Sequence, residues 1–379
     1  MTKPSLLIVS FSDIANDARV KKQIGLFAEK YRVTTCGRGP AIREDVEHIQ
    51  LSAAGSRAGA IGQAICLRMH AWRAAFLFEP EVKQARRLLK GRSFDVAIAN
   101  DVESVVVAAE AAGYDRTLSD LHEYWPGLHD QNPSWVKLRR PFYNWMIRRY
   151  VARAGAAITV SQAIADRYLR EFGIACNVVH NATPKHDLSP TAVGANIRIV
   201  HSGGTQPNRQ PEVMMRAVAN SSAPVSMDMY LTGQGTEYAR TLIKLADELG
   251  DRVTILPPKP YDELIAALNQ YDVGIHILPP TNTNNVLALP NKLFDYVQAR
   301  LAVVAGPTPD IQHRVEEFDL GVITDGFDEA DVQRAVDALT PAAVTEWKHN
   351  AHRAAQVLNA EYELPVLRDA IDGLLKARR

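Results

Sequence analysis

Residues 289–306 read LPNKLFDYVQARLAVVAG, and this stretch predicts a helix followed at once by a short buried strand. Pro290 suits the first turn of a helix, where its missing N–H costs nothing. Lys292 and Asp295 stand three residues apart, so they are neighbours on the surface of that helix. The apolar run Ala302–Ala305 gives the strand. A helix that leads directly into a strand is typical of a β-α-β unit.

The same alternation of short apolar runs and longer helical patterns extends through the chain. In the first half we expect helices at 20–30, 102–112, 142–154 and 162–172. Between them lie strand candidates at 6–10, 32–36, 94–99, 117–120, 156–160 and 177–180. Strands separated by helices of this length form right-handed units and a parallel sheet.

The alternation pauses at residues 182–196, which hold two prolines, a glycine and no apolar periodicity, and so predict a linker. A second set of strands is expected at 197–202, 226–231, 252–256, 273–277, 302–305 and 321–323. We therefore predict an α/β protein with two Rossmann-like, doubly wound domains at 1–183 and 184–360, followed by a helical segment at 361–379. Ligands bind beyond the carboxyl ends of such strands, so a cleft between the domains is expected.

Composition excludes several classes of protein. The formal net charge of the 379 residues is zero, which gives no reason to expect a nucleic-acid partner. Cys36, Cys66 and Cys176 are too few and too widely spaced for a disulfide framework or a metal site, and they fit a cytoplasmic protein. No window approaches the roughly 20 apolar residues that cross a bilayer. We expect a soluble cytoplasmic protein, with attachment to the inner face of the membrane as the alternative.

Two segments predict anion binding from their residues alone. The N–H groups that open the Pro290 helix would bind an anion, and Asp295 one turn later could accept hydrogen bonds from ribose hydroxyls. A solvated helix residue is the alternative interpretation of Asp295. Gly203 and Gly204 follow a predicted strand and would allow close approach of phosphates, or they form a plain turn. Arg209, a few residues later, carries a fork of donors that suits a diphosphate.

Several segments resemble the GT-B glycosyltransferases of family 4, in the same order and on the same kinds of element. Residues 289–306 resemble their nucleotide-binding helix in its P-N/S-K-L-F/Y-E-Y form. The other matching segments are 17–20 (DARV), 119–123 (SDLHE), 158–164 (ITVSQAI), 179–182 (VHNA), Gly203-Gly204 with Arg209, 231–235 (LTGQG) and 272–274 (DVG). The resemblance spans nearly the whole chain. It implies a hexosyltransferase-type enzyme of GT-B fold whose C-terminal helix packs back on the first domain.

The resemblance also implies site residues and chemistry. The nucleotide-sugar donor would be bound by Gly203, Gly204, Arg209, Gly233, Pro290, Asn291, Lys292 and Asp295. His122, Glu123 and Arg209 would be the catalytic residues, with the acceptor on the first domain. Family members retain the anomeric configuration, and the leaving phosphate helps to deprotonate the acceptor.

One position departs from the family pattern. The usual signature has two glutamates, and Asp295 occupies the place of the second with a shorter side chain. The place of the first falls on Leu287, which cannot face a donor sugar with a polar group. Asn284 or Asn285 would be the neighbouring substitutes. The departure leaves the identity of the donor sugar open.

The first domain offers fewer signals. His122 and Glu123 follow a predicted strand, where a histidine can bond the sugar or simply satisfy loop backbone, and where Glu123 could orient the acceptor or act as a base. For Asp17 and Arg19, an ion pair at a helix start is an equally good explanation.

No metal or cofactor is predicted. The chain lacks a D-x-D carboxylate pair and a His/Cys cluster with ligand spacing. Arg209, Lys292 and helix N-termini would take the place of a cation at the phosphates. The expected donor is a UDP- or GDP-sugar, which is a substrate.

Two basic stretches with apolar residues allow peripheral membrane contact. One runs from Lys137 to Tyr150 and includes Phe142 and Trp145; the other, 57–87, includes Ile65, Leu67, Trp72, Phe76 and Leu77. The favoured interpretation is that both bury their apolar faces in the first domain and leave the arginines solvated.

The prediction is thus a glycosyltransferase that moves a sugar from a nucleotide-sugar to a glycoconjugate or surface polysaccharide, with a glycan or lipid-linked glycan as acceptor. Alternatives are an inverting GT-B enzyme or nucleotide-sugar epimerase, and a non-catalytic nucleotide-sugar-binding subunit, which Leu287 would favour. A Rossmann oxidoreductase is disfavoured, because FSDIA and not a G-x-G-x-x-G motif follows the first strand.

Overall fold

The computed structural model describes residues 3–52, 55 and 57–376, so the first two and last three residues of the predicted domains lie outside the description. The chain forms two compact units. The first unit contains residues 1–180, 282–284 and 364–379, and the second contains 181–281 and 285–363. Residues 282–284 therefore group with the first unit, which the sequence does not predict.

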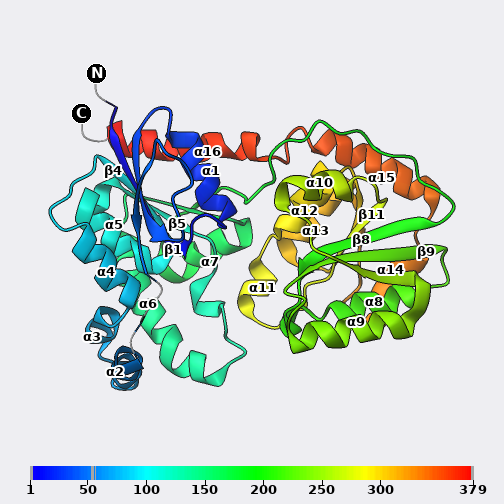
Figure 1. The fold of residues 1–379 in the computed structure, drawn as a ribbon, viewed down its shortest axis with the longest axis horizontal. Helices are drawn as coiled ribbons and strands as arrows, with labels where there is room; N and C mark the ends of the chain where they lie inside the picture. Colours follow the sequence, from blue (N-terminus) through cyan, green and yellow to red (C-terminus); the bar gives the residue numbers. More distant parts are fainter. Residues whose placement is uncertain (1–2, 53–54, 56, 377–379) are drawn as a thin grey trace. The chain divides into compact units, whose positions relative to one another are not determined.

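Within the described residues, the first unit holds a seven-stranded parallel sheet in the order β3-β2-β1-β4-β5-β6-β7 (Figure 1). The strands are β1 (Ser5–Asp13), β2 (Arg32–Arg38), β3 (Glu47–Gln50), β4 (Val96–Asn100), β5 (Thr117–Leu121), β6 (Ala156–Thr159) and β7 (Asn177–Val178). The helices are α1 (Ala18–Phe27), α2 (Arg57–Arg68), α3 (Trp72–Leu77), α4 (Pro80–Leu88), α5 (Val105–Ala112), α6 (Arg140–Arg149) and α7 (Gln162–Phe172). Strand β1 pairs with β2 and β4 on its two sides, so it is an interior strand, and β4 is the middle one.

The last helix, α16 (Ala360–Lys376), completes the core of the first unit (red in Figure 1). Its residues Leu367, Ile371 and Leu374 are buried in one cluster with strand residues such as Ile8 and Val96 and with the inner face of α1. Tyr31 donates a hydrogen bond to Asp372 at 2.7 Å. The chain thus returns to the first sheet after the second is complete.

The second unit holds a six-stranded parallel sheet in the order β10-β9-β8-β11-β12-β13, counted over the described residues. The strands are β8 (Ile197–Gly204), β9 (Val225–Thr232), β10 (Val253–Leu256), β11 (Val273–His276), β12 (Ala302–Ala305) and β13 (Gly321–Ile323). The helices are α8 (Pro211–Ala219), α9 (Glu237–Leu249), α10 (Tyr261–Leu268), α12 (Asn291–Gln298), α13 (Pro309–Glu317), α14 (Glu329–Asp337) and α15 (Pro341–Ala354). A further helix, α11 (Thr283–Leu287), has its first two residues in the first unit and the rest in the second.

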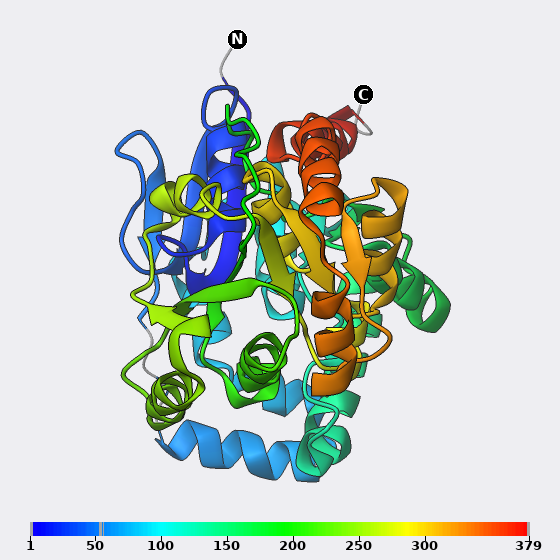
Figure 2. The same cartoon turned by 90° about the vertical axis from the view of Figure 1, so that its right-hand side faces the viewer.

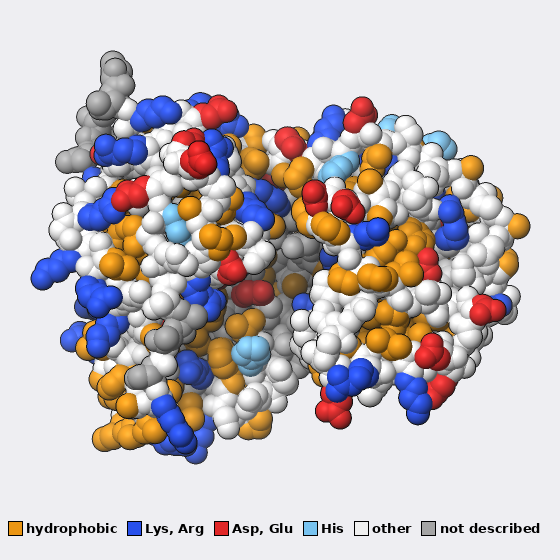
Figure 3. All heavy atoms as spheres, viewed as in Figure 1, with side chains coloured by type: hydrophobic (Ala, Val, Ile, Leu, Met, Phe, Trp, Pro, Cys, Tyr) orange, Lys and Arg blue, Asp and Glu red, His pale blue; other side chains and the backbone are white. Residues whose placement is uncertain are grey.

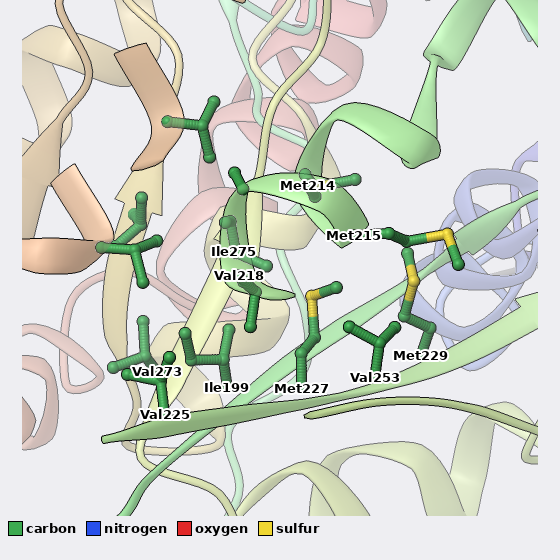
Figure 4. Close-up of a cluster of buried hydrophobic side chains, with 14 of the residues drawn as sticks. Ile199, Met214, Met215, Val218, Val225, Met227, Met229, Val253, Val273 and Ile275 are labelled. Atoms are coloured by element: carbon green, nitrogen blue, oxygen red, sulfur yellow. The ribbon is translucent and has the colours of Figure 1, made fainter. Parts of the chain in front are cut away.

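Helices cover both faces of this second sheet (Figure 2), so its interior strands are rich in buried apolar residues. One face packs against α8, α9 and α14, and the other against α10, α12, α13 and α15. Four methionines belong to the buried cluster on the first face, Met214 and Met215 of α8 and Met227 and Met229 of β9, and Figure 4 shows Met215 beside Met229. Unbranched thioether side chains suit an irregular gap between helix and sheet.

The predicted linker is an extended segment that is partly packed. Ala182 and Thr183 are fully buried, and the Thr183 hydroxyl bonds the Asp295 carboxylate at 2.6 Å. Further along, Arg300 donates to the carbonyls of His186 and Leu188. These bonds fasten the segment to the second unit, so it is not a free tether.

Loss of a buried side chain of α16 should destabilise the first unit. Ile371 is fully buried, so Ile371→Ala should lower the free energy of unfolding by about 2–4 kcal/mol through lost burial and the cavity left behind. Val366 lies on the same helix and is 36% exposed, so Val366→Ala should change it by less than about 0.5 kcal/mol. Urea denaturation followed by circular dichroism measures both, and equal effects would show that α16 is not part of the core.

Candidate active site

The polar residues of the first unit gather at the carboxyl ends of two neighbouring strands. Strand β4 ends at Asn100 and is followed by Asp101, while Asp120 lies near the end of β5 and His122 just after it. Asn100 and Asp120 are paired in the parallel register of these strands. Such strand ends are where doubly wound sheets bind ligands.

A buried ion pair organises this edge. Arg19 of α1 donates two hydrogen bonds of 2.7 Å to the two oxygens of Asp120, and a third of 2.9 Å to the carbonyl of Val179. Both charged side chains are buried. Asp17 has a separate role, because its carboxylate caps α1 by accepting from the N–H groups of Arg19 and Val20. The proposed ion pair at the helix start is therefore made by Arg19 with Asp120, and Asp17 is the cap.

His122 lies between two carboxylates. Its Nδ1 is 3.6 Å from Asp101 and its Nε2 is 3.5 Å from Asp120, while Nε2 is also 3.1 Å from the side-chain oxygen of Asn100. Burial alone would lower the pKa of the imidazole, but the charges of Asp101 and Asp120 outweigh it and raise the pKa to about 9. His122 is therefore a cation at neutral pH and a hydrogen-bond donor, not a general base.

Asp101 is a residue that sequence reasoning missed. Its carboxylate accepts from the backbone N–H of His122 at 3.2 Å and from the indole N–H of Trp125 at 3.0 Å. Its backbone adopts φ +66°, a strained conformation for a residue with a side chain. Strained residues of this kind cluster at functional sites. The only signal in the sequence was a carboxylate directly after a buried strand.

The loop after β5 places Glu123 against residues 282–284. The Glu123 carboxylate accepts a bond from the Asn284 amide, and the Asn284 oxygen accepts from the Tyr124 N–H at 2.8 Å. The Asn285 amide instead bonds Pro279 and Thr281. Leu287 is half-buried at the end of α11. Both asparagines that were considered as substitutes for the missing glutamate thus have partners within their own units.

Beside this loop lies a polar hollow of about 280 Å³. Its walls carry hydroxyl, carboxylate, guanidinium and amide groups, from Tyr124, Asp130, Arg140, Asn144, Arg167, Glu171 and Thr283. The side-chain oxygen of Asn144 is buried and has no partner among the described residues. The hollow is lined for a polar, neutral or weakly charged ligand.

The second unit brings three of the predicted donor residues to one place. Gly203, Arg209 and Lys292 line a small hollow of about 20 Å³ together with Pro211 at the start of α8. Arg209 is exposed, and the described residues give it no hydrogen-bond or ion-pair partner. The two cations Arg209 and Lys292 therefore converge on one hollow at the start of α8, where the positive end of the helix dipole also favours an anion.

The remaining predicted donor residues do not line that hollow. Gly204 ends β8, and Gly233 has φ +76° in the turn after β9, where Thr205 bonds its carbonyl at 3.0 Å. Pro290 and Asn291 open α12 as the sequence predicts. Asp295 is 1% exposed, and it accepts from Thr183 and from Lys292 at 3.1 Å. Its carboxylate thus orients Lys292, and its contact with a ribose stays a prediction.

Two histidines beside the hollow were missed. His201 and His276 lie on neighbouring strands with parallel rings 6.0 Å apart. His201 donates to the Ile275 carbonyl at 2.9 Å, whereas neither ring nitrogen of the buried His276 has a partner in the described chain. Burial first, and then the charges of Lys292 and Arg209, lower the pKa of His201 to about 4 and that of His276 well below its usual range. Both rings are neutral near pH 7.

Gly203 keeps this place open. A Cβ at position 203 would lie 2.7 Å from Nε2 of His201, so a side chain there would push into the ring. A buried polar group without a partner costs about 1–3 kcal/mol, so a group that bonded the His276 nitrogens would be stabilising. Within a strand, a histidine gives no sequence signal of this kind. Among the described residues there is no cluster of three or more His, Cys, Asp or Glu side chains that could hold a metal ion.

Comparisons with known proteins concern the family and the fold. Residues 26–185 match the family model Glycosyltransferase Family 4. A search of curated proteins by sequence finds no match.

Solved structures share the fold over the whole chain. Sucrose-phosphate synthase from Thermosynechococcus elongatus has a TM-score of 0.75 at 16% identity, covering 99% of this chain and 100% of that one. Anabaena HepE has a TM-score of 0.70 at 15% identity, covering 98% and 100%. The α,α-trehalose 6-phosphate synthase from Burkholderia multivorans has a TM-score of 0.69 at 11% identity, covering 100% of both chains. At these identities the likeness establishes the GT-B fold.

The His122 environment predicts a pH dependence of stability. The pKa of about 9 in the folded state lies above the roughly 6.5 of an unfolded histidine, so the stabilisation is complete below pH 6.5 and is lost as pH rises through 9. Wild type should lose up to about 1.4 kcal/mol of unfolding free energy per pH unit in this window, and His122→Gln should lack that slope. The exposed His349 gives the control variant His349→Gln, which should keep it. Urea denaturation at several pH values measures the slope, and identical slopes would contradict a charged His122.

Proposed function

We propose that this chain, a glycosyltransferase of GT-B fold whose residues 26–185 match family 4, transfers a sugar from a nucleotide-sugar to a glycoconjugate or surface-polysaccharide acceptor, with retention of configuration and without a metal. The single observation that carries the proposal is the hollow at the start of α8, where Arg209 and Lys292 converge beside Gly203.

The donor diphosphate binds over this hollow. Arg209 offers a planar fork of donors to two phosphate oxygens, and Lys292 is held in place by Asp295 at 3.1 Å. The departing diphosphate gains negative charge, which the two cations and the positive end of the α8 dipole stabilise. These groups supply the positive charge that a metal gives in other transferases.

His276 completes the phosphate site. Its buried ring has two nitrogens without partners in the described residues and lines the same hollow as the two cations. A neutral imidazole can donate a hydrogen bond to a phosphate oxygen through one nitrogen, and ligand binding would remove the cost of leaving it unpaired.

The acceptor binds in the polar hollow of the first unit. Its mixture of carboxylates, guanidinium groups and the Asn144 amide suits the hydroxyls of a sugar, and 280 Å³ is close to the lower limit of about 300 Å³ for ligand pockets. His122 stands nearby as a cation that donates hydrogen bonds. The acceptor is a glycan or a lipid-linked glycan, and the enzyme works in the cytoplasm at the inner face of the membrane.

The charges favour retention over inversion. An inverting transferase needs a base, but two carboxylates keep His122 protonated. In the retaining reaction the acceptor hydroxyl attacks the anomeric carbon on the face from which the diphosphate leaves. A phosphate oxygen of the leaving group accepts the hydroxyl proton.

Nucleotide binding tests the donor site. UDP-sugars are the first to try, because HepE was solved in complex with UDP and glucose. A UDP-, GDP-, ADP- and TDP-sugar panel with EDTA present should raise the melting temperature for one nucleotide class by mass action. Arg209→Ala should weaken that binding at least tenfold, which corresponds to about 1.4 kcal/mol for a lost charge-assisted bond.

Arg216 provides the matched control, since it is exposed on α8 and does not line the hollow. Arg216→Ala should bind within twofold of wild type. If the protein melts cooperatively but no nucleotide-sugar changes its melting temperature, the proposed donor site is wrong.

Product stereochemistry tests retention. With a UDP-α-linked donor, proton NMR of the earliest transfer or hydrolysis product should show the α anomer. A β product would instead assign an inverting mechanism and would require a base other than His122.

A further inference from the structure

The two basic, apolar stretches of the sequence have opposite fates in the structure. In α6, Phe142 and Met146 are fully buried, as the favoured interpretation predicts. In α2, in α3 and in the turn between them, several large apolar side chains face solvent: Ile61 is 55% exposed, Ile65 50%, Met69 74% and Leu77 59%. Residues 57–87 therefore leave an apolar surface exposed, whereas α6 buries its apolar side chains.

The exposed side chains of α2 form one stripe. Arg57, Ile61, Ile65 and Arg68 recur at spacings of four, four and three residues, so they lie on a single helix face. The opposite face packs inward through Gln63 and Leu67, which are buried. The stripe is thus the outer face of a packed helix, with an arginine at each end.

The neighbouring helix α3 repeats the pattern. Arg73 and Leu77 are exposed four residues apart, and Phe78 follows at 41% exposure. We call the surface formed by Arg57, Ile61, Ile65, Arg68, Met69, Arg73, Leu77 and Phe78 the α2–α3 face. Figure 3 shows orange and blue side chains side by side at the end of the first unit where Figure 1 labels α2 and α3.

The charge of this face has one sign. Residues 57–78 include three arginines and neither Asp nor Glu. The next acid, Glu79, is turned toward the Gln63 amide and lies 3.7 Å from Arg139, so it does not neutralise the face. Protein surfaces rarely leave such a contiguous apolar patch without a use.

We propose that the α2–α3 face docks on an anionic lipid bilayer. Its isoleucines, methionine, leucine and phenylalanine would enter the interface between headgroups and acyl chains, while the arginines bind lipid phosphates. Among the described helices none is long and apolar enough to span a membrane, so this contact would be peripheral. The proposal rests on the membrane location given in the proposed function and names the surface that makes the contact. It does not require that a nucleotide donor is bound.

Sedimentation with sucrose-loaded vesicles tests the proposal without any nucleotide. Vesicles of phosphatidylcholine alone are compared with vesicles that also contain phosphatidylglycerol. Wild type should bind the anionic vesicles at least tenfold more tightly, and higher salt should weaken the binding. The double variant Ile61→Glu/Ile65→Glu should lose at least tenfold in affinity for the anionic vesicles.

The matched control is Leu169→Glu/Ile243→Glu, which adds the same charge at exposed apolar positions on α7 and α9. This variant should bind vesicles like wild type within about twofold. All four sites are exposed, so melting temperatures close to wild type should confirm that both variants are folded.

Three outcomes would overturn the proposal. These are a wild type that ignores anionic vesicles, equal losses in the two double variants, and a concentration-dependent dimer that Ile61→Glu/Ile65→Glu abolishes in the absence of vesicles. The last would assign the face to a second copy of the chain. Nucleotide binding by the same variants, measured by thermal shift, separates failure of this proposal from failure of the donor site.

Discussion

The buried ion pair between Arg19 and Asp120 holds together the carboxyl edge of the first sheet. Removing two charges from water costs several kcal/mol for each ion, so such a pair survives only with complete hydrogen bonding. Here Asp120 accepts two bonds from Arg19 and one from Gln23, and Arg19 also bonds the Val179 carbonyl. One pair therefore joins α1, β5 and the segment after β7. Loss of either partner would leave a buried charge, at a cost of about 3–5 kcal/mol.

The second unit has a buried ion pair too, but at the amino edge of its sheet. Lys348 is 3.2 Å from Asp272, which directly precedes β11, and its ammonium also bonds the Tyr271 carbonyl and the Thr191 hydroxyl. This set is closed, because each proton of the ammonium has an acceptor. At the carboxyl edge of the same sheet the cations Arg209 and Lys292 instead line a hollow. The charges at the amino edge thus stabilise the fold, whereas the cations at the carboxyl edge are placed to bind an anionic ligand.

The strands and helices could be predicted from the pattern of apolar residues along the chain. Site residues that meet only because two strands are neighbours in the sheet could not be predicted in this way. Every predicted strand has a counterpart in the structure, and interior strands such as β4 and β12 are fully buried and read as mainly apolar runs. The edge strand β3 was missed, since its residues Glu47–Gln50 are largely polar. Arg209 and Lys292 could be chosen from motifs. Asp101 could not, because its position beside His122 depends on the order β1-β4-β5, which no local pattern encodes. In the sequence His276 has no feature that separates it from other strand residues; only the structure shows that its ring nitrogens have no partner among the described residues.

The contrast between α2 and α6 shows why composition alone cannot decide what a basic, apolar segment does. In α6 the pair Phe142 and Met146 stands four residues apart and fills a groove of the first unit, so the arginines are pushed to the surface. In α2 the same spacing is met twice, by Gln63 and Leu67 on the inner face and by Ile61 and Ile65 on the outer one. A helix of this kind can bury only one of its two faces against its own domain. The face left over carries Arg57 and Arg68 and no acid, and burying it at an anionic surface would recover about 25 cal/mol for each Å² of apolar area.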